Sequence, residues 1–210
     1  MSLKHLLLRS LAIASLGASL AFIPVSHAQT GQGYVTLQPA QPSDTAGKVE
    51  VLEFFAYTCP HCFTMEPMTA KWSQTLPDNV AFKRVPVAFN AGMADLQKLY
   101  YSLEALGRLD LHEKVFVAIH RERTRMQNFN AIADWAEKQG LDRKQFEAAF
   151  RSFGINNKVA RANELAKNYN IEGTPSLAVG GRYVTSPSMA GSYEGTIVEA
   201  QKRLDAVLGQ

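Results

Sequence analysis

The fold of this chain is decided by the stretch Phe55-Ala56-Tyr57-Thr58-Cys59-Pro60-His61-Cys62, which contains both cysteines of its 210 residues. An apolar run ends here and a helix is expected to begin, with Cys59 at or near the N-cap and Pro60 at the first helical position. Helical positions i and i+3 have Cα atoms roughly 5 Å apart, within disulfide range. Free backbone N–H groups and the helix dipole favour an anion at the N-cap. The pattern therefore predicts a redox-active cysteine pair with one stabilised thiolate.

Two other uses of a close cysteine pair are a structural disulfide and a metal site. A disulfide across so short a loop restricts the unfolded chain little and joins no distant elements. A zinc site needs about four ligands. Once the leader described below is removed, the chain offers only His61, His112 and His120, none at ligand spacing from the cysteines. Both alternatives remain open, but the redox interpretation is favoured and no metal is expected.

Residues 1–28 have the three parts of a secretory signal peptide. Lys4 and Arg9 supply a positive start, an apolar run extends from Leu11 to Val25, and Ser26-His27-Ala28 ends the segment with small residues where signal peptidase reads them. The alternative is a membrane anchor, but the run is interrupted by polar residues and falls short of the ~20 apolar residues that a span needs. We therefore predict export and cleavage after Ala28.

Composition and charge exclude several classes of partner. Removing 28 of the 210 residues leaves 182, enough for one sizeable core or one domain with an insertion. Only Lys4 and Arg9 are charged in the removed segment, so the formal net charge falls from +3 to +1. A nearly neutral chain without a basic run gives no reason to expect binding to nucleic acid or to an anionic membrane.

The first half of the mature chain has a strand–helix–strand pattern. Residues 34–37 are expected to form a short strand and residues 49–57 a strand covered on both faces, because its apolar run is nearly continuous. A helix follows from Pro60 to about Thr75, with a kink expected at Pro67. Residues 80–87 form the next strand, so a right-handed crossover and a parallel strand pair are predicted.

Helical periodicity dominates from Ala91 to about Lys167, and strands return after Gly173. Within the helical block, one helix is expected to end at Gly107, one to start at an Asn130 cap and one to start at about Asn157. Gly180-Gly181 separates strands at 176–179 and 182–185, which is typical of a two-residue hairpin. An amphipathic helix closes the chain.

Three of these features together resemble the DsbA family of bacterial periplasmic thiol:disulfide interchange proteins. They are Cys59-Pro60-His61-Cys62 at a strand-to-helix junction, Gly173-Thr174-Pro175 before the hairpin, and the helical block between them. The resemblance covers nearly the whole mature chain and implies an α/β thioredoxin fold with an inserted all-helical domain. The expected divisions are the signal peptide (1–28), the thioredoxin-like domain (29–90 and 163–210) and the helical insertion (91–162).

The resemblance also implies roles for individual residues. Cys59 would be the exposed nucleophile and Cys62 the buried resolving thiol. Glu53 matches the buried acid beneath the family's active site, Pro175 its cis-proline, and Thr174 the residue whose backbone pairs with a bound peptide. Glu66 matches a second acid on the first helix.

The residue types allow further expectations about some of these positions. Glu53 lies in an apolar strand, where burial should raise the pKa of its carboxyl group, so a proton relay to Cys62 is favoured over a lysine pair at the end of the sheet. His61 is expected to tune the Cys59 thiolate. We expect Glu66 to be a solvated helix residue, and His112 and His120 to lie partly exposed on a helix.

The predicted activity is that of an oxidase that donates its Cys59–Cys62 disulfide to exported proteins with reduced cysteines. The resemblance implies a DsbB-type quinone-linked membrane protein as the partner that reoxidises the pair, and no cofactor. The chain lacks a second disulfide and the dimerisation domain of disulfide isomerases, so a monomer is expected. The alternatives are a periplasmic reductase or isomerase, and a peptide-binding chaperone whose disulfide is incidental.

Overall fold

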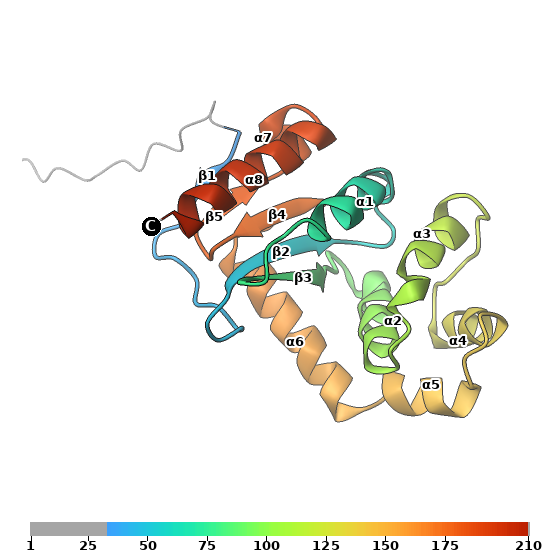
Figure 1. Ribbon diagram of the computed structural model, residues 1–210. Coiled ribbons are helices and arrows are strands. Elements are labelled where there is room, and N and C mark those ends of the chain that lie inside the picture. Colours follow the sequence, from blue (N-terminus) through green and yellow to red (C-terminus); the bar gives the residue numbers. More distant parts are fainter. Residues whose placement is uncertain (1–32, 210) are drawn as a thin grey trace, which may run out of the picture.

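The computed structural model describes residues 33–209, which form a five-stranded sheet with helices on both faces (Figure 1). The strands are β1 (Val35–Thr36), β2 (Val49–Phe55), β3 (Val80–Pro86), β4 (Ser176–Val179) and β5 (Tyr183–Thr185). The helices are α1 (Pro60–Ser73), α2 (Ala94–Ala105), α3 (His112–His120), α4 (Phe129–Lys138), α5 (Arg143–Phe150), α6 (Phe153–Asn168), α7 (Pro187–Ala190) and α8 (Tyr193–Leu208). The predicted signal peptide lies outside the described residues.

The sheet has the strand order β1-β5-β4-β2-β3. Strands β2 and β3 are parallel, as predicted, and their register places Glu53 beside Arg84. The other neighbours are antiparallel, and β4 and β5 form the predicted hairpin at Gly180-Gly181. Both glycines have positive φ, and a Cβ on Gly181 would lie 2.0 Å from the carbonyl oxygen of Gln41, so this turn requires glycine.

Two separate hydrophobic clusters lie on the two faces of the sheet, because successive side chains of β2 point to opposite faces. Val51 packs with Leu177 and Leu204 beneath α1 and α8. Leu52 and Phe54 point the other way, into the larger cluster that contains α2, α3 and α6. The inserted helices α2–α6 cover that face and the end of the sheet beyond β3 (Figure 1), so the predicted thioredoxin fold with a helical insertion is confirmed.

Two helix starts differ from the prediction. The cap of α4 is Asn128, whose side chain accepts the N–H of Ala131, and not Asn130. Helix α6 begins at Phe153 and not at Asn157, because the Ser152 side chain accepts the N–H of Ile155 and caps it earlier.

The domain boundaries stay a prediction. Helix α6 runs without a break through residues 162 and 163 and contacts both α2 and β3. Within residues 33–209, no helix has both the length and the apolar character needed to cross a bilayer.

Candidate active site

The two cysteines lie at the start of α1, just after the end of strand β2. Cys59 is the N-cap residue with extended backbone angles, and Pro60 follows at the first helical position, as predicted. Cys62 is buried one turn later, whereas Cys59 keeps part of its surface exposed. Neither cysteine is part of a disulfide in the structure.

The surroundings of the two sulfurs shift their acidities in opposite directions. The pKa of Cys59 is lowered to about 5, first by a hydrogen bond from the Cys62 thiol and further by the backbone N–H groups of Cys62 and His61. The pKa of Cys62 is raised far above its usual range, first by burial and then by the neighbouring Cys59 thiolate. Cys59 can therefore be a thiolate at neutral pH, while Cys62 holds a proton.

The loop before β4 faces the cysteine pair from the other side. The peptide bond between Thr174 and Pro175 is cis, as expected from the resemblance. The Thr174 carbonyl oxygen lies 3.2 Å from Cys59 Sγ, across 115 residues of sequence. A cysteine at the surface is thus held against a backbone carbonyl next to a proline.

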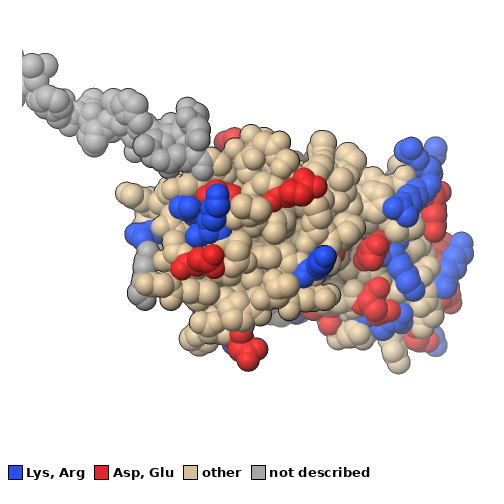
Figure 2. All heavy atoms as spheres, turned by 45° about the horizontal axis from the view of Figure 1, so that its top comes forward, with Lys and Arg blue, Asp and Glu red and all other residues tan. Residues whose placement is uncertain are grey.

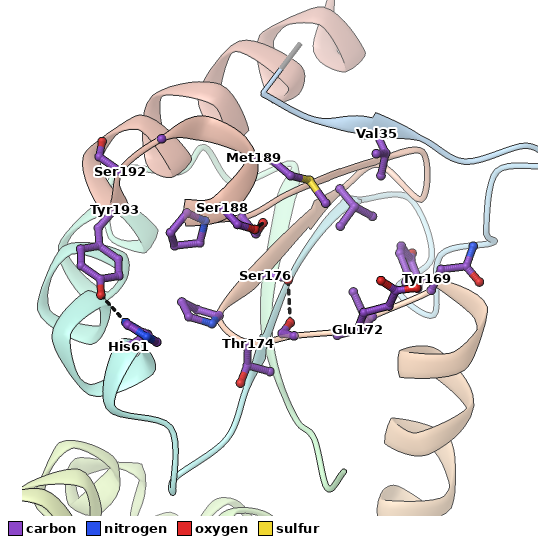
Figure 3. Close-up of a pocket in the computed structure, with 18 of the residues that line it drawn as sticks. Val35, His61, Tyr169, Glu172, Thr174, Ser176, Ser188, Met189, Ser192 and Tyr193 are labelled. Atoms are coloured by element: carbon purple, nitrogen blue, oxygen red, sulfur yellow. Dashed lines mark hydrogen bonds between the residues drawn. The ribbon is translucent and has the colours of Figure 1, made fainter. Parts of the chain in front are cut away.

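A groove of about 840 Å³ runs from this loop between β1, α7 and the start of α8. Figure 3 shows His61 and Tyr193 along one side of the groove, with Val35, Tyr169 and Glu172 on the other. Met189, 42% exposed, also lines it. On the face drawn in Figure 2, charged side chains gather at the two sides of the molecule and are fewer between them. An extended chain with apolar side chains would fit such a surface.

Beneath the cysteines, an arginine holds two buried acids. Arg84 Nη2 lies 2.7 Å from Glu66 Oε1, and Arg84 Nε lies 3.0 Å from Glu53 Oε2. The second contact is an ion pair without hydrogen-bond alignment, and neither of its atoms has another partner among the described residues. Burial raises the pKa of Glu53 to about 7, with repulsion from Glu66 adding to the effect, and burial raises the pKa of Glu66 to about 7.

A histidine and a tyrosine extend this buried cluster toward α3. Burial lowers the pKa of His112 to about 3, so its imidazole is neutral. Its Nε2 lies 3.3 Å from Glu66 Oε2, and its Nδ1 lies 2.7 Å from Tyr57 Oη. A neutral ring satisfies both contacts if Nε2–H donates to the carboxylate and Nδ1 accepts from the phenol. Helix α3 therefore contacts the residues next to the redox loop.

The structure corrects two expectations from the sequence. Glu66 is not solvated: it is 5% exposed and paired with Arg84. His112 is 4% exposed and packs among aromatic rings, whereas His120 is half-buried, with its Nε2 2.8 Å from the Tyr57 carbonyl oxygen. The ion-pair partner of Glu53 is Arg84 on the adjacent strand, so the less favoured alternative of a lysine at the end of the sheet does not apply.

Sequence reasoning also missed Arg84 and Tyr193. A signal existed for Glu66, because it lies four residues after Cys62 and so shares the inward face of the helix. No local signal marks Tyr193, whose partner His61 lies 132 residues away. In the described part of the chain, no three His, Cys, Asp or Glu side chains gather in a way that could hold a metal ion.

Comparison with known proteins gives one consistent result. Residues 50–193 match the model of the DSBA-like thioredoxin domain. The thiol:disulfide interchange protein DsbA of Bordetella pertussis is 54% identical over 190 residues, which is 90% of this chain and 91% of that protein. The DsbA of Burkholderia cepacia is 39% identical, with 92% of each chain covered. The crystal structure of Pseudomonas aeruginosa DsbA is 33% identical and superposes with a TM-score of 0.80, covering 86% of this chain and 96% of that one.

Proposed function

The chain belongs to the family of DsbA-like thioredoxin-domain proteins and is a thiol:disulfide oxidoreductase, and from that premise we propose that it is an oxidase for exported proteins. It would act in the periplasm and donate the Cys59–Cys62 disulfide. The observation that carries this proposal is the opposite environment of the two sulfurs. A low pKa of Cys59 stabilises the reduced form of the pair, and a stable reduced form makes the disulfide a strong oxidant.

The proposed reaction has two exchange steps. A substrate thiolate attacks Cys59 Sγ, a mixed disulfide forms, and Cys62 leaves as a thiolate that takes up a proton. A second substrate thiolate then attacks the substrate sulfur of the mixed disulfide and displaces Cys59. The substrate gains a disulfide, and the protein keeps the two electrons as a thiolate–thiol pair. Cys59 leaves readily because its thiolate is stabilised.

Glu53 is proposed to supply and remove the proton of Cys62. The support is its burial beneath the site and its pKa of about 7, which lets it hold or release a proton near neutral pH. Glu66 and Arg84 would set that pKa, because a buried acid and a buried cation act on Glu53 in opposite directions. Glu53 would thus be the proton carrier and its two neighbours positioning residues.

The surface residues have proposed roles in substrate handling. Pro60 fixes the start of α1, and His61 would stabilise the adjacent thiolate through its charge. Thr174 and Pro175 would contact the extended substrate chain, which the adjacent groove could accept. The partners would be exported proteins with reduced cysteines and a DsbB-type quinone-linked membrane protein that reoxidises the pair. We expect a monomer that needs no bound cofactor.

Two measurements test this proposal. The thiolate absorbance of a Cys62→Ala variant should titrate well below pH 7, and the equilibrium constant with glutathione should place the pair among strong oxidants. Cys59→Ser should abolish oxidation of a reduced substrate, with Ser152→Ala as a control remote from the sulfurs. A thiolate midpoint near 8.5 would contradict the oxidase. If the parent protein does not oxidise the substrate, and Cys59→Ser binds peptide as well as the parent does, the chaperone alternative would be favoured.

A further inference from the structure

His61 is held by a residue from the far end of the chain. Its Nδ1 lies 2.6 Å from the hydroxyl oxygen of Tyr193, across 132 residues of sequence. The two rings lie beside each other with centroids 6.2 Å apart and a tilt of 37°. Figure 3 shows the pair at one side of the groove, with Tyr193 projecting from the start of α8 toward His61 at the start of α1. His61 is itself exposed, so without this bond its ring would be free to rotate.

Tyr193 is anchored on both sides of its position in the chain. Ser192 caps α8 by accepting the N–H of Gly195 at 2.8 Å. A Cβ at Gly195 would lie 2.6 Å from the carbonyl oxygen of Ala190, so the turn from α7 into α8 is closely packed. The ring of Tyr193 also packs against the cluster under α1 and α8. Its hydroxyl group therefore occupies a fixed position relative to α1.

We propose that Tyr193 is a positioning residue for the redox reaction, whose hydroxyl group holds the His61 imidazole beside the Cys59 thiolate. A phenol donates to neutral Nδ1 and accepts from protonated Nδ1–H, so the bond can persist in both states. The bond to the charged ring is the stronger one, because charge-assisted hydrogen bonds exceed neutral ones. Tyr193 would thus add to the stability of the reduced pair. The inference rests on the proposed oxidase function.

Other ionisable groups line the same groove or lie close to this pair in the sequence. Tyr169 and Glu172 line the same groove from the segment before β4, Glu194 follows Tyr193 on α8, and Cys59 precedes His61 by two residues. Among the described residues, the hydrogen bond to the imidazole comes from Tyr193. The effect of removing the hydroxyl group can therefore be separated from those charges by substitution.

The test is a double-mutant cycle with Tyr193→Phe and His61→Ala, read out by the glutathione equilibrium. Two glutathione thiols reduce the Cys59–Cys62 disulfide and leave as oxidised glutathione. Tyr193→Phe should make the pair about threefold less oxidising and should raise the Cys59 thiolate midpoint by about 0.5 pH unit. In the His61→Ala background, the same substitution should change neither value. Tyr183→Phe is the matched control, because Tyr183 packs against the same cluster but contacts Tyr34 and Arg203.

The outcomes separate this inference from the proposed function. An equal change in both backgrounds would show that Tyr193 acts on the fold and not through His61, and would overturn the inference. An unchanged equilibrium constant in Tyr193→Phe, with His61→Ala still less oxidising, would also overturn it while leaving the oxidase intact. If the Cys59 thiolate of the parent protein does not form well below pH 7, the proposed function itself would be contradicted. Denaturant midpoints for each variant check that the comparison is made between folded proteins.

Discussion

The two ends of strand β2 carry buried carboxylates that behave in opposite ways. Glu50, near the start of the strand, accepts from Lys83 Nζ at 2.6 Å, Thr45 Oγ1 at 2.6 Å and the Asp44 N–H at 3.1 Å. Glu53, near the end, has only a poorly aligned contact to Arg84. The pKa of Glu50 is lowered: burial acts to raise it, but the donors together outweigh burial. The pKa of Glu53 is raised to about 7.

Both side chains are nearly inaccessible, so exposure alone does not set their acidity. What differs is the number of donors aimed at each carboxylate and how far each site lies from water. The cysteines repeat the contrast, since hydrogen bonds lower the pKa of Cys59 and burial raises the pKa of Cys62. Two buried carboxyl groups on one strand can therefore have pKa values shifted in opposite directions.

Removing Arg84 should have the largest effect on this contrast. Arg84→Met leaves Glu53 and Glu66 buried without their cation, which should lower the free energy of unfolding by about 3–5 kcal/mol. The loss should be greater at pH 8 than at pH 5, because both carboxyl groups can take up protons at the lower pH. Urea unfolding at the two pH values measures this. A loss that is equal at both values would mean that these acids are already neutral in the parent protein.

The cysteine pair should show the next largest effect, in the stabilities of the two redox forms. The folded pKa of Cys59, about 5, lies below the value of ~8.5 for a free thiol, so the reduced form gains stability as pH rises from 5 to 8.5. At pH 7 this gain is about 2 kcal/mol after allowance for partial exposure. In the oxidised form, the disulfide stabilises the fold by a similar amount, because it restricts the unfolded chain.

The reduced form should therefore overtake the oxidised form in stability as pH rises. The advantage should be lost as pH falls through the folded pKa of Cys59. Denaturant midpoints of both forms between pH 5 and 8.5 measure the difference. Oxidised protein that stays clearly more stable across the whole range would contradict the disulfide-donor assignment.

Glu50→Gln and Glu53→Gln form a matched pair on one strand. Glu50→Gln should cost about 1–2 kcal/mol at neutral pH, because the lowered pKa contributes stability that is present above the unfolded value and lost in acid. Glu53→Gln should have the opposite effect on the pH dependence of stability. Parent stability falls between pH ~4.3 and 7, because the unfolded chain releases the Glu53 proton first, and the variant should lack this fall. Only Glu53→Gln should slow substrate oxidation, and equal slowing by both would remove the proton-carrier role.

The smallest effect is expected at the α3 end of the buried cluster. Tyr57→Phe removes the 2.7 Å bond to His112 Nδ1 and should cost about 1 kcal/mol. The cost should disappear in a His112→Phe background, where no ring nitrogen is left unpaired. Unfolding free energies of the four proteins in this cycle measure the coupling. An undiminished cost in that background would assign the effect to packing.

Sequence patterns predicted the parts of this molecule that depend on nearby residues. The strand–helix–strand unit, the Gly180-Gly181 hairpin and the Cys59 cap follow from local periodicity and turn chemistry. The cis bond before Pro175 came from the family resemblance and not from the residues themselves. The positions of Glu66 and His112 depend on partners in other elements. The pairing register of β3 with β2 places Arg84 beside the acids. The rings around His112 belong to β2, α2 and α3. No single-segment pattern contains that information.

The contact between the Thr174 carbonyl and Cys59 Sγ has a consequence for the chain while it is being synthesised. Thr174 is synthesised 115 residues after Cys59, and His120, which contacts the Tyr57 carbonyl, follows 63 residues after Tyr57. A growing chain that ends before Thr174 has the Cys-Pro-His-Cys sequence but not the surface that packs against it. Short helices are marginal without tertiary packing, so the start of α1 would not yet present its N–H groups to the sulfur. The nascent Cys59 should then react like an ordinary thiol, and the protein would become a catalyst only when its last third has been added.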